Sequence, residues 1–235
     1  MKKTTIILSA VLGLLLMNIE LVHAQNAEKK KNKVNGAIGY ANFSQNFFDF
    51  NSLNTSLKLN GYSQVENLVP SFGGGGFTVI NNFIIGGEGS SLFDLQSVSS
   101  NANAGISGGY GICNFGYIVY SGKRSVVYPL IGIGGGGYDI RISKTNGSKD
   151  FNQQLASPNG IVKLNSGGAL VNAQINYNFF FNSNNKEGFM LGFNAGYRYS
   201  IGSWRMKMDK TYISNAPNLN MDGFYFSITL GGGSL

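Results

Sequence analysis

The stretch 188–204 constrains the fold more than any other part of the sequence, because its side chains alternate in character with a period of two. One set of alternate positions is apolar and ends in tyrosines: Phe189, Leu191, Phe193, Ala195, Tyr197, Tyr199 and Ile201. The other set is small or polar and carries one cation: Met190, Gly192, Asn194, Gly196, Arg198, Ser200 and Gly202. Successive side chains of a β-strand point to opposite faces. The stretch is therefore predicted to be a strand with one apolar face and one narrow polar face.

Seven further stretches have strand-like patterns, at 35–43, 71–80, 83–98, 104–120, 126–143, 164–181 and 223–230. The connections alternate between long (44–69, 144–159, 205–221) and short (81–82, 121–124, 182–187), with 99–103 intermediate. This arrangement predicts an all-β fold, an eight-stranded antiparallel up-and-down barrel with both termini at the end of the short turns. Side chains just fill the interior of a barrel of this size, so no wide pore is expected.

The first long connection contains apolar residues at helical spacing, Phe50, Leu53 and Leu57. Either Asn51 or Ser52 could cap the start of a helix there, and Gly61 would end it. We expect a short amphipathic helix that packs over one mouth of the barrel.

The medium outside the barrel follows from composition. Charged residues make up only 12% of the chain, whereas a soluble surface carries about a quarter to a third. A soluble, lipocalin-like carrier in the periplasm is an alternative in which the apolar faces would point inward. Its outer face would need many Lys and Glu residues, but the second face here is mostly Gly, Asn, Gln and Ser. The pattern favours strands in lipid, with Tyr197, Tyr199 and Trp204 near the external interface, where amphipathic aromatic residues gather.

The N-terminus has the pattern of a secretory signal. Lys2 and Lys3 precede an apolar run over 4–17, and small residues close the segment at Ala24. The run is shorter than the roughly 20 residues that a spanning helix needs. We predict a cleaved signal peptide at 1–24, a polar basic segment at 25–34, and a barrel domain at 35–235.

Several kinds of chemistry are not expected. The only histidine, His23, would leave with the signal peptide, so the remaining chain has no imidazole for nucleophilic catalysis or metal binding. The glycine run 132–137 matches a dinucleotide-binding pattern, but it lies inside a predicted strand and does not open a helix. We expect no enzyme activity, no cofactor and no metal. Nucleic-acid binding is also not expected, because the positive charge outside 25–34 is scattered.

The candidate site is a network of charges in the lumen, formed by Glu88, Asp139, Arg141 and Arg198. After the glycine run 134–137, the apolar set of the strand shifts by one position to Tyr138, Ile140 and Ile142. A β-bulge in the run would account for this shift and keep Asp139 and Arg141 inside. Opposite charges in a narrow lumen should pair. The network is expected to be structural; a gate or a narrow ion path is the alternative.

The signal-like N-terminus, the period-two strands, the aromatic strand ends and the closing pattern Phe224-x-Phe226-x-Ile228-x-Leu230 resemble the small outer-membrane β-barrel superfamily. The Asn- and Gly-rich style is similar to that of Bacteroidetes-type members. The resemblance implies a barrel of the bacterial outer membrane that contacts its lipid, and we expect it to be monomeric and non-enzymatic. Two roles stay open. One is a structural or interaction role through loops 44–69, 144–159 and 205–221. The other is a narrow pore for small solutes.

Overall fold

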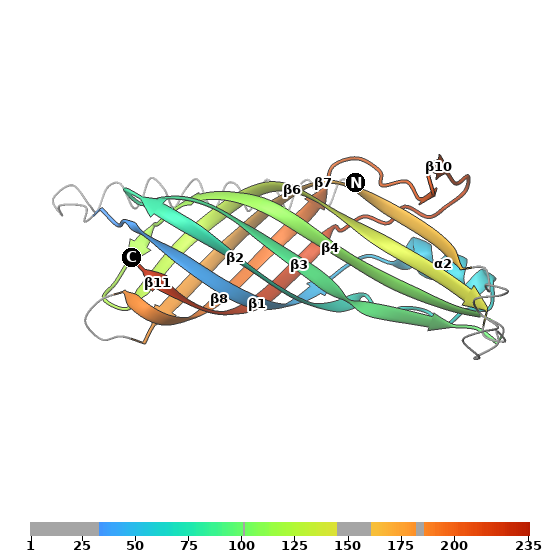
Figure 1. The fold of residues 1–235 in the computed structure, drawn as a ribbon, viewed down its shortest axis with the longest axis horizontal. Coiled ribbons are helices and arrows are strands. Elements are labelled where there is room, and N and C mark those ends of the chain that lie inside the picture. Colours follow the sequence, from blue (N-terminus) through green and yellow to red (C-terminus); the bar gives the residue numbers. More distant parts are fainter. Residues whose placement is uncertain (1–32, 101, 145–160, 182–185) are drawn as a thin grey trace, which may run out of the picture. The chain divides into compact units, whose positions relative to one another are not determined.

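A computed structural model of the protein describes residues 33–100, 102–144, 161–181 and 186–235. Residues 1–24, most of 25–34 and nearly all of 144–159 lie outside the described residues. The described chain contains one helix, eight long strands and three two-residue strands (Figure 1). The long strands are β1 (Gly36–Phe47), β2 (Leu68–Ile80), β3 (Phe83–Val98), β4 (Ala102–Tyr117), β6 (Ser125–Lys144), β7 (Val162–Phe180), β8 (Glu187–Ser200) and β11 (Gly223–Ser234).

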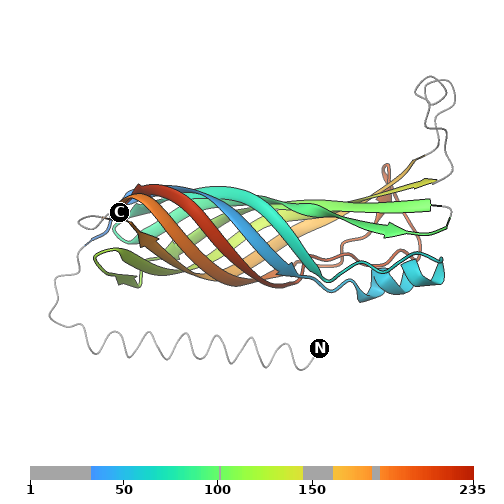
Figure 2. The same cartoon turned by 90° about the horizontal axis from the view of Figure 1, so that it is seen from below.

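The long strands close into an antiparallel barrel. Each pairs with its neighbour in the chain, and β1 also pairs with β11, which completes the ring. Figure 2 shows the strands inclined as they wrap around the barrel. The short strands extend this sheet: β5 (Tyr120–Ser121) pairs with β6, while β9 (Lys207–Met208) pairs with β7 and with β10 (Thr211–Tyr212). The predicted fold class is confirmed.

The turn between β2 and β3 has the backbone geometry that the sequence predicts. Asn81 and Asn82 have φ angles of 52° and 73°. Two consecutive positive φ angles are typical of a type I′ hairpin turn, and asparagine tolerates them well. The Asn82 side chain also accepts a hydrogen bond of 2.7 Å from the backbone N–H of Val34. This bond attaches the start of the barrel domain to the short-turn end.

The predicted helix is present as α2 (Asn51–Leu59). Neither Asn51 nor Ser52 caps it; the Asp49 carboxylate instead accepts a hydrogen bond of 3.0 Å from the Asn51 backbone N–H. Gly61 ends the helix as predicted, with a φ of 75°. The backbone N–H groups of Gly61 and Tyr62 bond to the carbonyls of Lys58 and Leu57, which is a Schellman motif. Among the described residues, no helix is long and apolar enough to cross a membrane.

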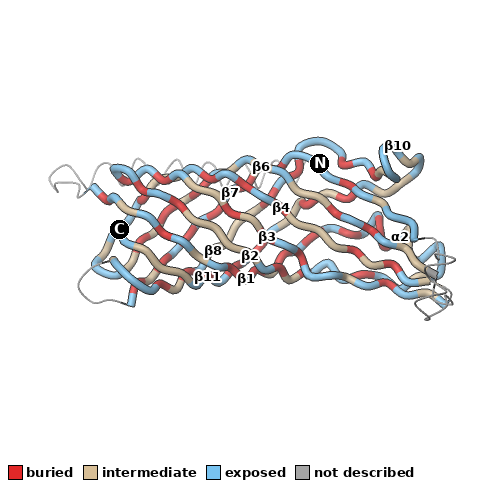
Figure 3. Tube along the Cα trace, viewed as in Figure 1, coloured by how far each residue is buried: buried red, intermediate tan, exposed pale blue. Residues whose placement is uncertain are grey.

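The outer wall of the barrel is apolar over most of its height. Residues alternate between buried and exposed along each strand (Figure 3). The exposed set includes large apolar side chains from all eight long strands, for example Phe43, Phe72, Ile85, Phe115, Ile131, Ile175, Phe193 and Phe226. All of the predicted outward residues of 223–230 are in this set. The wall therefore faces an apolar medium, which excludes the soluble carrier with an apolar interior and a solvated surface.

Four adjacent strands, β3, β4, β6 and β7, continue beyond the outer ends of the other four. Their pairing reaches Val98 opposite Asn103 and Ile142 opposite Val162. A register shift between Leu92 and Leu95 marks a bulge in β3 at the start of this extension. The intermediate length of connection 99–103 follows from the extension, because β3 and β4 continue almost to the tip of their hairpin.

The predicted bulge in the glycine run of β6 is wrong. Gly134 lies opposite Ile112 and Tyr138 opposite Gly108, with no shift between them. Tyr138 and Ile140 are buried on the inner face, whereas Asp139 and Arg141 are exposed on the outer face. The inference failed because it assumed that apolar side chains always point outward. In the extension, the inside of the sheet packs against loops and the outside is polar.

Candidate functional site in the barrel lumen

Arg198 occupies the centre of the polar layer in the lumen. Its side chain is only 1% exposed and projects inward from β8. The guanidinium donates hydrogen bonds of 2.7 Å to the side-chain Oδ1 of Asn46 and of 2.7 Å to the Tyr110 hydroxyl. Its central carbon lies 3.9 Å from the ring centroids of both Tyr110 and Tyr225. A cation between two aromatic faces is strongly stabilised when water is excluded.

Glu88 contributes the acidic group of the same layer. It is 8% exposed, and one of its carboxylate oxygens accepts a hydrogen bond of 3.1 Å from the Tyr40 hydroxyl. Gly75 on the neighbouring strand makes room for this pair: a Cβ at Gly75 would lie 2.9 Å from both the Glu88 Cβ and the Tyr40 hydroxyl. A glycine at that point lets two large polar side chains meet inside a narrow barrel.

The remaining residues of the layer are uncharged and bonded to each other. The Tyr225 hydroxyl donates to Asn172 at 2.9 Å and also contacts Gln174. The Asn178 amide donates to the Tyr128 hydroxyl at 2.8 Å. Asn172, Gln174, Asn176 and Asn178 are all buried, as the alternation in 164–181 predicts. Together these amide side chains fill the lumen between Arg198 and the barrel end that carries the short turns.

Only two of the four predicted charges are in the lumen. Glu88 and Arg198 project inward, but Asp139 and Arg141 lie on the outer face of the extension. The lumen residues that the prediction omitted are the tyrosines 40, 110 and 225 and Asn46. The alternation of side chains along the strand could have identified Tyr225 as inward, because it lies between the outward Phe224 and Phe226. The sequence carries no signal for Asn46, because the predicted first strand ends before it.

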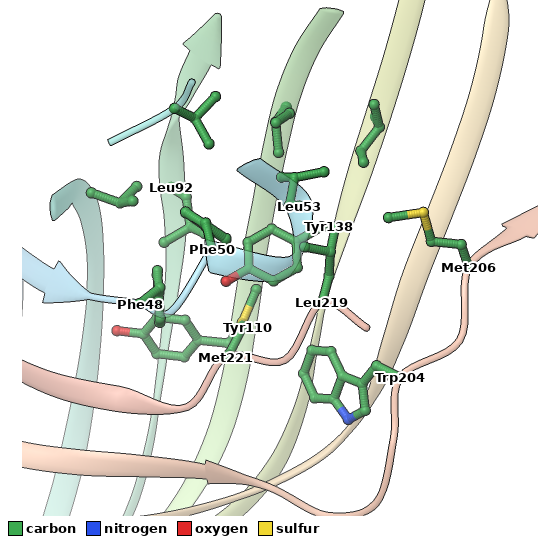
Figure 4. Packing of buried hydrophobic residues seen from close by; sticks show 14 of the residues in the cluster. Phe48, Phe50, Leu53, Leu92, Tyr110, Tyr138, Trp204, Met206, Leu219 and Met221 are labelled. Atoms are coloured by element: carbon green, nitrogen blue, oxygen red, sulfur yellow. The ribbon is translucent and has the colours of Figure 1, made fainter. Parts of the chain in front are cut away.

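An apolar cluster fills the external mouth above Arg198 (Figure 4). Phe48, Phe50 and Leu53 come from the connection that contains α2, and they pack on Tyr138 of β6. The second wall of the cluster comes from the connection 201–222, through Trp204, Met206, Leu219 and Met221. Trp204 is 2% exposed, so its predicted place at the membrane interface is wrong. It lies against Gly168, where an added Cβ would be 2.4 Å from the indole nitrogen.

A second apolar cluster closes the end with the short turns. Its members are Val34, Ile38, Phe77, Val79, Ile84, Ile118, Val126, Tyr128, Leu130, Phe180 and Met190. The polar layer with Glu88 and Arg198 thus lies between two apolar layers. Among the described residues, no group of three or more Cys, Asp, Glu or His side chains is arranged to hold a metal ion. The arrangement can neutralise buried charge and stiffen the barrel.

A closed barrel with an apolar outer wall and a polar layer inside defines an integral β-barrel protein of the bacterial outer membrane. No family model and no curated protein matches the sequence. Solved structures similar to the chain include the outer membrane protein OprG from Pseudomonas aeruginosa. It has 7% identity and a TM-score of 0.47 over 86% of this chain and 96% of that one.

Two further solved structures are similar to the chain. Ail, the attachment invasion locus protein of Yersinia pestis, has 15% identity and a TM-score of 0.38, over 85% of this chain and 95% of that one. The outer membrane protease OmpT from Escherichia coli has 8% identity and a TM-score of 0.39, over 89% of this chain and 99% of that one.

Proposed function

We propose that the protein is a non-enzymatic, monomeric outer-membrane barrel with a sealed lumen, and that its external surface binds a partner. The observation that carries this proposal is the apolar cluster in the external mouth. It holds the α2 connection and the connection 201–222 against the inner face of the extended strands. Loops fixed in this way present a surface of defined shape to the outside. A binding protein needs such a surface, whereas a channel needs an open mouth.

Exposed apolar side chains on these same segments support the binding role. Leu59 at the end of α2 is 82% exposed, and Tyr212 on β10 is 58% exposed. Both lie beyond the lipid-facing wall, where water makes such exposure unfavourable unless something covers it. The predicted partner loop 144–159 lies almost entirely outside the described residues.

A binding experiment tests this role. Nanodiscs that carry the barrel would be applied to a panel of extracellular-matrix proteins and bacterial surface polymers. The variant with Leu59→Ser and Tyr212→Ser should lose any binding that the parent shows. The variant Lys58→Ser changes an exposed neighbour on α2 and should keep it. Equal binding by the parent and the double variant would contradict the proposed surface.

Conductance separates the sealed barrel from the narrow pore, which is the second candidate because Glu88 and Arg198 lie together in one polar layer inside the lumen. In planar bilayers, the parent should give no single-channel steps, since apolar layers lie on both sides of the charges. Steps in the parent that change with Arg198→Ala would favour the pore.

The Bacteroidetes-type origin is a finer proposal that is supported only by the Asn- and Gly-rich sequence. If it is correct, the barrel should assemble more completely in a Bacteroidetes host than in Escherichia coli, as measured by heat-modifiable mobility. Equal assembly in both hosts would contradict the proposed Bacteroidetes-type origin.

A further inference from the structure

The outer wall at the level of the external interface differs between the two sides of the barrel. On one side, aromatic side chains from adjacent strands contact each other in the pairs Phe47–Phe226 and Tyr197–Phe224, and Phe43 of β1 contacts Phe93 of β3 across β2. Such a girdle is typical of the membrane interface. On β4, β6 and β7, the outward positions at this level are Gly109, Gly111, Gly135, Gly137, Gly167 and Ala169. The girdle is therefore interrupted on that side.

A polar hollow of about 480 Å³ lies at this interruption. Outward side chains of β3, β4, β6 and β7 line it, and they are Ser91, Asp94, Ser107, Asp139 and Asn165. Ser107, Asp139 and Asn165 lie directly opposite one another on three adjacent strands. The hollow thus presents two carboxylates, two hydroxyls and an amide, and its floor includes Gly109 and Gly137. These groups can form hydrogen bonds with the hydroxyl and amide groups of a sugar.

Cations lie beside the hollow and on its external side. Arg141 is directly opposite Lys163, and both are exposed on the outer face. Lys207 of β9 lies opposite Asn165, with its ammonium 4.8 Å from the ring centroid of Tyr212. Like charges directly opposite on paired strands are destabilising on their own. A bound anion would relieve this repulsion, and both Arg and Lys form charge-assisted hydrogen bonds with phosphate.

We propose that this face is a binding site for a phosphorylated glycolipid of the outer leaflet. Its sugar occupies the polar hollow, and its phosphates contact Arg141, Lys163 and Lys207. Its acyl chains lie along the glycine positions of β4 and β6, where the wall is not filled by side chains. The inference rests on residence in the outer membrane, and it shares with the proposed partner surface only the contact between Lys207 and Tyr212.

Native mass spectrometry of the full barrel in detergent tests the site, with bisphosphorylated lipid A as the probe. The parent should retain one lipid A molecule. The double variant R141Q/K163Q should lower the retained fraction about tenfold or more, as the loss of two charge-assisted contacts implies. Ser107→Trp, which fills the hollow and keeps every charge, should also abolish retention. Heat-modifiable mobility would establish that each variant is folded.

A matched control removes two exposed cations elsewhere. K58Q/K123Q changes the same net charge at positions away from the hollow and should bind as the parent does. Unchanged binding by R141Q/K163Q would overturn the site. So would equal retention of lipid A from which both phosphates have been removed. A similar loss in K58Q/K123Q would show attraction by net charge alone and would overturn the site as well.

Discussion

The two halves of β7 use the same alternation with opposite chemistry. Between residues 172 and 178, the outward side chains include the exposed Ile175 and Tyr177, and the inward ones are buried amides. Between residues 163 and 170, the outward side chains include Lys163 and Asn165, and the inward Leu170 is fully buried. The backbone does not change between these halves, but the media on its two sides do. Lipid lies outside the first half, and water lies outside the outermost part of the second, at Lys163 and Asn165.

This comparison shows what period-two patterns can reveal. Alternation gives the strand and the parity of each side chain, but parity alone does not say which face is inside. The face must be assigned from the medium at each height of the barrel. A strand longer than the membrane crosses from one medium to another, so one rule cannot hold along its whole length.

The largest effect is expected at the external cluster, where the interior of the extension becomes apolar. Phe50 is fully buried and stacks edge-to-face with Tyr138 at 5.7 Å between ring centroids. Phe50→Ala should remove about 3–5 kcal/mol from the packing of the α2 connection. Hydrogen exchange should then show faster exchange at 48–67, with the lipid-facing strands unchanged. Leu59→Ala, at an exposed site on the same helix, should leave exchange unaltered. If exchange at 48–67 were the same in Phe50→Ala as in Leu59→Ala, the cluster would not hold the loop.

A charge on each half of β7 tests the change of medium directly. Ile175→Arg places a cation on the lipid-facing wall and should lower the free energy of unfolding in vesicles by about 2–4 kcal/mol. The converse change, Lys163→Ile, lies on the same face of the same strand but in water. Its effect should stay within about 0.5 kcal/mol, as for ordinary surface substitutions. Similar losses at both positions would contradict the two-medium description. Urea titration of each variant gives the comparison.

Much of the membrane-spanning part could be predicted from the sequence. Every predicted strand overlaps an observed one, and the inward amides of 172–178 were assigned correctly. The turn at Asn81–Asn82 and the stop at Gly61 also follow from local chemistry. These features depend on short-range rules, because a strand in lipid has one fixed apolar side and a turn has its own residue preferences.

The external part could not be predicted in the same way. Tyr138, Ile140 and Trp204 are apolar in the sequence, but their burial depends on contacts between loops and strands that are distant in the chain. Asp139 and Arg141 were misplaced for the same reason. The pairing of Arg198 with Tyr110 and Tyr225 needs the registers of three strands, and no local pattern contains them.

Two nearby glycines, one on each face of the wall, should differ in how much an alanine substitution changes the free energy of unfolding, and this difference is smaller than the preceding ones. Gly134 faces the lumen, and an added Cβ would lie 2.0 Å from the Gly111 carbonyl oxygen and 2.7 Å from the Ile112 Cα. Gly134→Ala should therefore cost about 1–3 kcal/mol, since neighbouring backbone must move. Gly111 faces outward, and a Cβ there meets nothing within 4 Å. Gly111→Ala should be neutral or slightly stabilising. Equal destabilisation would mean that the outer glycines are also closely packed.

The smallest expected effect is the most informative about where the lipid ends on β6. Asp139 lies on the outer face two positions beyond Gly137, and it is exposed. If water surrounds it, Asp139→Leu exchanges one solvated side chain for another, and the free energy of unfolding should change by less than about 0.5 kcal/mol. If lipid reached this height, removing the charge would stabilise the barrel by about 1 kcal/mol. The matched change Asp94→Leu, on the same hollow but on β3, should also be silent. A gain in stability at Asp139 alone would place the lipid boundary higher on β6 than on β3. Ser107, Asp139 and Asn165 would then lie inside the membrane.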